Sequence, residues 1–460
     1  MKMSKRNLPA DSIILFISLW CAFEFIISPY PFYGKVNGVF PTIDFGLKFD
    51  LSEILIYSFI FLSLLLLLRR FLTKQNITLG YGYNKYLILI FSVFLLSSIL
   101  VGFFARGPTF LVMVRVQMIL LLFLIFMNLY DTKYLMTKII KILYYTGLIN
   151  VFIAFCAFFQ IELWRLTIYP DFISYMKYMW FGLYVSIFSY AILLNKIFIK
   201  RKSSMLDYAL LIMIVIVVLI NITNKPIFLA AFIVTFTTLL VFFNARIKRV
   251  KIGIISLLVL LSPMFLYLGL DEEKKFLFVY VVSERFLKAP AYDLTDLVEN
   301  LTTMESSGGR DFSAGRLELW QWYLSNVLDT PIVSDNFGAR PSIPLSSVGD
   351  EEVEFAAHNS VVHYTYYAGY IAGVSLLLII LYFIKTTFNY KKRLVYYNTA
   401  KKYKLKEYEF HGMLAFMYAI IGNELVGGPL SNAKFSWFWW LLVVFVLKVI
   451  SETRMQYKNV

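Results

Sequence analysis

The sequence has few charged residues and few cysteines. Only 16% of its 460 residues are charged and 59% are hydrophobic, whereas soluble domains average about 25% charged and about 45 to 50% apolar residues. This composition argues against a soluble enzyme. The two cysteines, Cys21 and Cys156, lie far apart in sequence within apolar segments, so they indicate neither a disulfide framework nor a metal pair. We predict that both are packing residues.

Apolar runs long enough to cross a membrane as a helix, which takes about 20 residues, recur along nearly the whole chain. They predict an all-α polytopic membrane protein with about twelve transmembrane helices. The expected spans lie near residues 11–28, 51–68, 86–104, 110–129, 139–160, 178–195, 205–222, 226–243, 252–269, 359–384, 411–427 and 435–450. The first run ends in Ser28-Pro29-Tyr30-Pro31, without the small residues of a signal-peptide cleavage site, and is therefore expected to remain as a helix.

The basic residues predict how these spans are oriented. With the N-terminus inside, the cytoplasmic segments hold 29 Lys and Arg residues, whereas the short outward segments hold seven. Because Lys and Arg collect on the cytoplasmic side of membranes, both termini are expected there, together with a basic loop at 385–410. The net charge of +15 therefore reports membrane orientation, and we expect no nucleic-acid partner.

One outward segment is much longer than the others. Residues 270–357 contain 16 acidic and seven basic residues and are expected to form a mostly helical outer loop domain between spans nine and ten. Residues 1–269 then carry spans one to nine, and residues 358–460 carry spans ten to twelve.

Within the outer loop, residues 274–288 are amphipathic enough to lie along the membrane surface, and Asp293 is a candidate cap for a second short helix. Residues 313–327 predict a third helix. On it, Arg316, Trp320, Tyr323 and Val327 are expected to share one face. The prolines and glycines of 331–349 predict irregular structure, and the acidic run that follows is expected to be a solvated loop rather than a divalent-cation site.

Ionisable residues at membrane depth are costly and therefore mark candidate sites. In this sequence they are expected in the outer leaflet or at its surface, and almost none falls at the midplane. They are Glu24, Arg115, Lys225, His358, His363 and Glu424. Transporters usually bind their substrates near the midplane, so this placement favours a site at the outer interface, where a lipid-linked substrate keeps its tail in the bilayer. A structural ion pair is an equal alternative for Arg115, and Glu24 and Glu424 are expected to pair helices rather than to catalyse.

Two parts of the outer loop suit phosphate and acid–base chemistry. Arg310 and Arg316 follow glycines, and an arginine side chain binds phosphate through two parallel hydrogen bonds without losing its charge. His358, beside Asn359 at the start of span ten, is a candidate general base because the pKa of histidine lies near neutrality.

The arrangement of these residues resembles the O-antigen polymerase and O-antigen ligase superfamily of bacterial envelope polysaccharide assembly. The matching positions are Gly315-Arg316, Trp320, Pro331, His358-Asn359-Ser360 and Gly369. A second family signature, a Ser-Arg pair that opens a span, aligns with Asn224-Lys225. Three positions depart from the pattern: Lys225 replaces an arginine, the Gly-x-Gly after the loop proline is absent, and Gly373 stands one position late.

The resemblance implies an inverting, metal-independent glycosyltransferase that needs no cofactor and uses a glycan linked to undecaprenyl diphosphate as its donor. His358 and Arg316 would be the catalytic residues, with His358 accepting the proton of the acceptor hydroxyl. Lys225, Arg310 and Arg115 would bind the diphosphate. Asn359, His363, Trp320 and Tyr323 would contact the sugar or the acceptor.

The family implies two possible acceptors. A polymerase adds the growing glycan to another lipid-linked repeat unit, whereas a ligase transfers it to lipid A-core or to protein. We favour the polymerase, facing the periplasm from the bacterial cytoplasmic membrane, with a chain-length regulator protein as a possible partner besides the bilayer. The alternative from another class is a flippase or exporter of lipid-linked sugar, which would need a polar pathway through the membrane that the sequence hardly provides.

Overall fold

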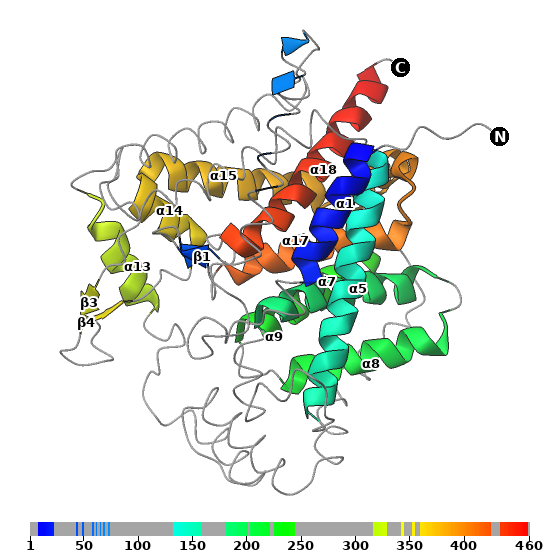
Figure 1. Ribbon diagram of the computed structural model, residues 1–460, viewed down its shortest axis with the longest axis horizontal. Coiled ribbons are helices and arrows are strands. Elements are labelled where there is room, and N and C mark those ends of the chain that lie inside the picture. The colour runs from blue at the N-terminus through cyan, green and yellow to red at the C-terminus, as the bar shows by residue number, and fades with distance from the viewer. Residues whose placement is uncertain are drawn as a thin grey trace, which may run out of the picture.

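The computed structural model describes residues 8–22, 132–158, 180–200, 203–220, 225–243, 316–328, 359–424 and 433–458, together with short pieces at 43–44, 48–49, 342–344 and 352–354 and single residues between 58 and 73. These residues are predominantly helical (Figure 1). The expectation of an all-α protein is thus confirmed at this level. The helices are α1 (Leu8–Cys21), α5 (Thr132–Phe158), α7 (Trp180–Ile199), α8 (Met205–Ile220), α9 (Lys225–Phe243), α13 (Arg316–Ser325), α14 (Ser360–Ala368), α15 (Tyr370–Thr387), α16 (Tyr390–Ala400), the 3-10 helix η6 (Lys401–Tyr403), α17 (Glu407–Asn423) and α18 (Ala433–Lys458).

Two short antiparallel strand pairs are the exceptions to the helical structure. Strand β1 (Ile43–Asp44) pairs with β2 (Lys48–Phe49), and β3 (Ser342–Pro344) pairs with β4 (Glu352–Glu354). The second pair lies within residues 270–357, the segment expected to form the outer loop, where irregular structure and a solvated acidic loop were expected. That expectation is corrected here, because Ile343 and Val353 stand opposite each other and let the two segments pair.

Two described helical stretches are long and apolar enough to cross a membrane: Leu135–Cys156 in α5 and Tyr370–Thr387, which is α15. Shorter apolar stretches occupy α7, α8, α9 and α18. All of them overlap with spans expected from the sequence. The spans expected at 86–104, 110–129 and 252–269 lie outside the described residues, as do the helices expected at 274–288 and after Asp293, so the number of spans remains a prediction.

Helix α7 lies at the centre of the packing and contacts α5, α9 and α17 (Figure 1). Its residues from Tyr184 to Asn195 are all buried, as expected for a helix that is apolar on every side. Most of α17 is buried as well. Cys21 and Cys156 are buried and form no disulfide, which agrees with the predicted packing role.

Glycines allow these helices to approach one another closely. A Cβ at Gly412 in α17 would lie 2.7 Å from the Cα of Ile192 in α7, and one at Gly147 in α5 would lie 2.3 Å from the carbonyl oxygen of Val185. Small residues at helix contacts are typical of helices packed within membranes, where close van der Waals contact replaces the hydrophobic effect.

Replacing Gly412 by alanine is expected to destabilise the protein by about 1 to 3 kcal/mol, the usual cost of overpacking. The added Cβ would meet backbone atoms of Ile192 and Ala191, so α7 and α17 would have to move apart. Thermal unfolding of the purified protein in detergent measures the loss.

Gly422→Ala is the matched control for this variant. The atom nearest to its Cβ is the terminal Cδ1 of Ile233, at 2.2 Å, which a change of rotamer can move away. Alanine also favours the helix by up to about 1 kcal/mol over glycine. Equal losses in the two variants would contradict a backbone contact at Gly412.

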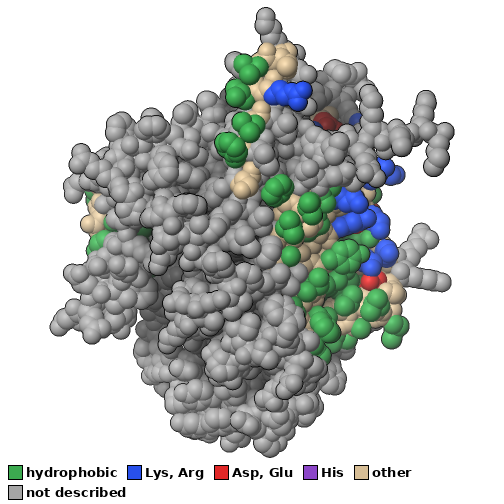
Figure 2. All heavy atoms as spheres, in the orientation of Figure 1, with side chains coloured by type: hydrophobic (Ala, Val, Ile, Leu, Met, Phe, Trp, Pro, Cys, Tyr) green, Lys and Arg blue, Asp and Glu red, His purple; other side chains and the backbone are tan. Residues whose placement is uncertain are grey.

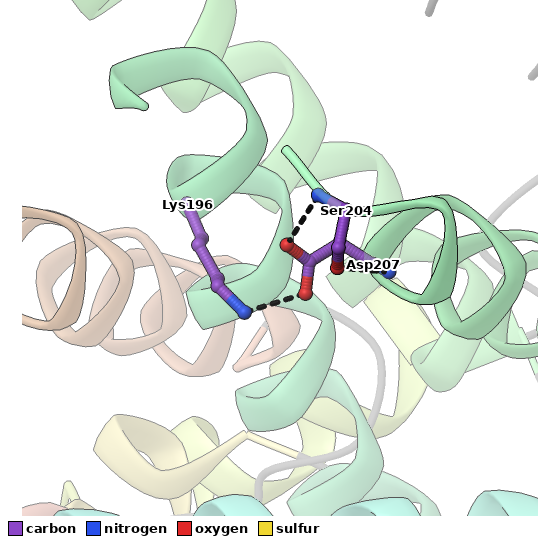
Figure 3. A network of polar contacts seen from close by, with 3 residues as sticks. All are labelled: Lys196, Ser204 and Asp207. Carbon is purple, nitrogen blue, oxygen red and sulfur yellow. Dashed lines mark hydrogen bonds and ion pairs between the residues drawn. The ribbon is translucent and has the colours of Figure 1, made fainter. Parts of the chain in front are cut away.

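The end of α7 and the start of α8 are joined by an ion pair (Figure 3). The Lys196 ammonium lies 2.5 Å from Oδ1 of Asp207. The backbone N–H of Ser204 donates to Oδ2 of Asp207 at 3.3 Å, and the Asp207 N–H donates back to the Ser204 hydroxyl at 3.2 Å. This reciprocal capping of the first turn of α8 fixes a tight connection between two antiparallel helices.

Candidate functional site

The structure describes only part of the predicted site. His358, Arg310 and Arg115 lie outside the described residues. Lys225 and Arg316 are the first residues of α9 and α13, and their side chains are also outside the described part. Asn359, His363, Trp320 and Tyr323 are described, and all four belong to the region where α13 meets α14.

Asn359 caps α14. Its backbone is extended (φ −149°, ψ 120°), and its side-chain oxygen accepts hydrogen bonds from the backbone N–H groups of Val361 at 2.9 Å and Val362 at 3.2 Å. The third N–H of this first turn, on Ser360, donates to Oε2 of Glu424 at 2.7 Å. A helix start leaves such donors without partners within the helix, and here two side chains bind all three.

Glu424 follows α17 directly and is only 5% exposed. Its carboxylate lies at the N-terminal end of α14, where the aligned peptide dipoles favour a negative charge. The sequence predicted a helix-pairing role for Glu424, and the contact with α14 agrees with it. The partner was not predictable from the sequence because Ser360 lies 64 positions away.

Further polar groups surround this carboxylate. The phenol groups of Tyr184 in α7 and Tyr364 in α14 are close enough to interact electrostatically with Glu424. The preceding residue, Asn423, is fully buried, and neither atom of its amide has a hydrogen-bond partner among the described residues. A buried amide is normally hydrogen-bonded, so Asn423 is a candidate substrate contact that the sequence did not reveal.

Helix α13 packs directly on α14. The Tyr323 ring meets the Tyr366 ring edge-on, with centroids 4.7 Å apart, and the Tyr370 hydroxyl donates to the carbonyl oxygen of Leu324 at 3.2 Å. The contact places the helix that begins with Arg316 against the helix that Asn359 caps. The two motifs of the predicted site therefore lie on neighbouring elements.

The aromatic residues of α13 mainly contact protein. Tyr323 and Val327 are fully buried and Leu319 is 4% exposed, whereas Trp320 is half-buried. The expected shared face is present for Tyr323 and Val327, with Leu319 completing it one turn earlier. Tyr323, predicted to contact sugar, turns its ring to Tyr366 instead, which leaves Trp320 as the better placed of the two for a ligand.

His363 lies one turn into α14 and is half-buried. Its ring centroid lies 4.3 Å from that of Tyr367 and 5.7 Å from that of Tyr364. The ring is thus held among tyrosines of its own helix. This environment suits a residue that shapes the site, and the predicted contact with sugar or acceptor remains a prediction.

A break at Gly369 separates α14 from α15. The sequence predicted one continuous span at 359–384, and the structure corrects this to two helices. Gly369 has φ 85° and ψ 170°, a conformation that essentially only glycine adopts. A Cβ at Gly373 would lie 1.8 Å from the Thr365 hydroxyl oxygen and 3.1 Å from the Val361 carbonyl oxygen, so α15 turns back along α14.

The break has a consequence for membrane depth. The nine residues of α14 extend about 13 Å at 1.5 Å per residue, which is too short for a hydrocarbon core of about 30 Å. Irregular backbone at membrane depth is tolerated where it is buried in protein or lines a cavity. In a membrane, α14 would therefore be too short to form a span of its own and would need protein around its end at Gly369.

The basic residues at the edge of the site begin helices that contact it. Lys225 starts α9, which packs on α17, the helix that leads to Glu424. Among the described residues, no cluster of three His, Cys, Asp or Glu side chains has the arrangement of a metal site.

No family model, curated protein or solved structure matches this chain. The resemblance to the O-antigen polymerase and ligase superfamily thus rests on the motif residues alone, and the function is argued below from those residues and from the geometry around α14.

Proposed function

We propose that the chain is a polytopic membrane glycosyltransferase with about twelve transmembrane helices, which polymerises lipid-linked polysaccharide repeat units at the outer face of the bacterial cytoplasmic membrane. The observation that carries the proposal is the assembly at the start of α14. Asn359, the residue after His358, caps α14, Glu424 accepts a hydrogen bond from the first turn of α14, and α13 packs against α14.

Exposed apolar residues support the membrane placement. They form stripes with helical spacing: Tyr145, Ile149 and Phe152 on α5; Phe232, Phe236 and Leu240 on α9; and Ile371, Val374, Leu378 and Leu381 on α15. Stripes of this size in water would be a liability, whereas lipid tails cover them at no cost. In Figure 2 most of the visible Lys and Arg side chains gather at the edge of the hydrophobic area, as at a membrane interface.

The arrangement of the elements supports the proposed orientation. In Figure 1, α13 and the β3–β4 pair, which belong to the outer loop, lie at the left of the view, and the C-terminal end of α18 lies at the upper right. Outer-loop elements and the expected cytoplasmic end of α18 are therefore at different ends of the described structure.

The proposed reaction is a single displacement. Arg316 and Lys225, with Arg115 and Arg310, bind the diphosphate of the donor and stabilise the charge that develops on it. His358 accepts the proton of the acceptor hydroxyl as that oxygen bonds to the anomeric carbon. The bond between this carbon and the diphosphate oxygen breaks, the lipid diphosphate leaves with the electron pair, and the anomeric configuration is inverted.

Glu424 assists this reaction as a positioning residue. Its carboxylate is bound to the backbone two residues after His358, so it holds the start of α14 in place. Asn423 adds a buried amide next to this carboxylate that suits a polar group of the substrate.

Reconstitution of the purified protein in vesicles tests the proposal. Lipid-linked repeat units alone are expected to yield a ladder of polymers. Product that forms only after addition of a lipid A-core acceptor would make the chain a ligase. Movement of the substrate across the bilayer without a new glycosidic bond would show that the chain is a flippase or exporter and not a glycosyltransferase. A chain-length regulator is the proposed protein partner, and it would narrow the ladder without being needed for bond formation.

A further inference from the structure

A second polar site lies at the far end of α15 from Gly369. An open pocket of about 680 Å³ is formed between α15, α16 and α18. Three lysines line it: Lys385 at the end of α15, and Lys391 and Lys392 in the first turn of α16. Tyr382 and Tyr396 form further parts of its wall. Since Lys385 lies 16 residues after Gly369, the pocket is about 24 Å along the helix from the candidate active site.

The described residues that line this pocket include no acidic residue, so none of them compensates the charge of the three lysines. Glu452, which precedes the wall residue Thr453, accepts a hydrogen bond from the Tyr403 hydroxyl. The start of α16 adds to the positive potential, because the N-terminal end of a helix carries a partial positive charge. Three cationic side chains around one hollow are therefore a site for an anion with several oxygen atoms.

Helix α16 is fixed firmly enough to hold the lysines in this arrangement. Arg393, next to Lys392, is 1% exposed, donates from Nε to the Thr387 carbonyl oxygen at 2.9 Å, and lies over the Tyr418 ring at 4.9 Å. Asn389 caps the helix by accepting from the backbone N–H of Lys391 at 2.9 Å. The pocket is thus a preformed feature of the helix junction.

An apolar stripe on α15 leads to this pocket. Ile371, Val374, Leu378 and Leu381 are each 42 to 51% exposed. At 100° per residue they share one face with Lys385, which stands 14 residues after Ile371, or about 21 Å along the axis. A ligand with an anionic head and apolar tails fits an apolar stripe that ends at a basic pocket. Its tails can lie along the stripe while its head binds the lysines.

We propose that the pocket binds the phosphate headgroup of an acidic phospholipid from the cytoplasmic leaflet, with its acyl chains along the exposed stripe of α15. Basic pockets between transmembrane helices on this side bind such headgroups. The inference rests on the proposed membrane placement but not on the glycosyltransferase activity. Binding ties α15, α16 and α18 together and stabilises the protein.

Native mass spectrometry of the full-length protein in detergent tests the proposal by titration with phosphatidylglycerol. Each lysine in such a site contributes about fivefold to affinity. Lys391→Gln combined with Lys392→Gln is therefore expected to weaken binding by about 25-fold, and to abolish the rise in melting temperature that the lipid produces. Phosphatidylcholine, which has the same phosphate but no net charge, is expected to bind weakly to both proteins.

The matched control combines Lys401→Gln with Lys402→Gln, because both lysines are exposed, lie in the same basic segment and are not part of the pocket wall. It removes the same charge and should bind phosphatidylglycerol like the wild type. Equal weakening in the two double variants would overturn the proposal in favour of diffuse attraction. Full competition by millimolar inorganic phosphate would also overturn it and indicate a soluble phosphate ligand. Loss of membrane association by the wild-type protein would instead contradict the proposed function.

Discussion

Replacing His358 by alanine is expected to lower the rate of glycosyl transfer by about 100- to 10,000-fold, the usual contribution of a general base. The acceptor hydroxyl would then lose its proton acceptor, while the diphosphate-binding residues would remain. Donor binding should therefore change little. Initial rates with purified protein and lipid-linked repeat units measure the loss, and donor titration separates binding from turnover.

His363→Ala is the comparison for this variant. It removes an imidazole five residues further along the chain, where the ring packs against Tyr367 in α14. We expect its main effect on the KM for the acceptor and a much smaller effect on turnover. If the His358→Ala protein forms polymers at the wild-type rate, His358 is not the general base, and the acid–base part of the proposal is wrong.

Replacing Glu424 by alanine is expected to reduce both stability and activity. The Ser360 N–H, now bound by the carboxylate at 2.7 Å, would be left buried without an acceptor, at a cost of about 1 to 3 kcal/mol. The first turn of α14, which begins two residues after His358 in the chain, would loosen. Glu424→Gln keeps an oxygen for Ser360 but removes the charge, so its loss of stability should be smaller. Thermal unfolding and polymerisation rates measure the two effects separately.

Glu409→Ala provides the control, because Glu409 plays a similar part at the opposite end of α17. Its Oε2 accepts from the backbone N–H of Lys406 at 2.8 Å, and it is 8% exposed. This variant should lose stability like Glu424→Ala while the folded fraction keeps its activity. If the two variants lost the same fraction of activity per folded molecule, Glu424 would have only a structural role.

Helices that follow from long apolar runs were predicted well. The expected spans at 205–222 and 226–243 correspond to α8 (Met205–Ile220) and α9 (Lys225–Phe243). In both, polar residues flank a segment that is mostly apolar, so the local sequence is enough to predict a helix. The basic cytoplasmic loop expected at 385–410 was assigned no secondary structure from the sequence, and the described structure has α16 and η6 within it.

The candidate site was predictable only in part. The motif residues around Arg316 and His358 could be found from their types and spacing, and they predicted that α13 and the start of span ten belong to one site. Tyr323 shares the buried face of α13 as expected, but it packs on Tyr366 instead of lining an open surface. Which side of an amphipathic helix meets protein and which meets a ligand depends on its neighbours, and the sequence does not contain that information.

The scarcity of charge and the length of the apolar runs determine the helical class of this protein and the membrane placement that we propose. Removing apolar side chains from water is the largest favourable contribution to the free energy of folding. In lipid, a helix also satisfies the backbone hydrogen bonds within its own segment. Tertiary structure alone decided two features. Gly369 breaks a segment that the sequence predicted as one continuous span, and α15 packs on α14 across this break at positive φ. In the sequence, Glu424 is one of several acidic residues near a helix end. In the structure its carboxylate accepts a hydrogen bond from the backbone N–H of Ser360 at the start of α14, where the helix dipole favours a negative charge.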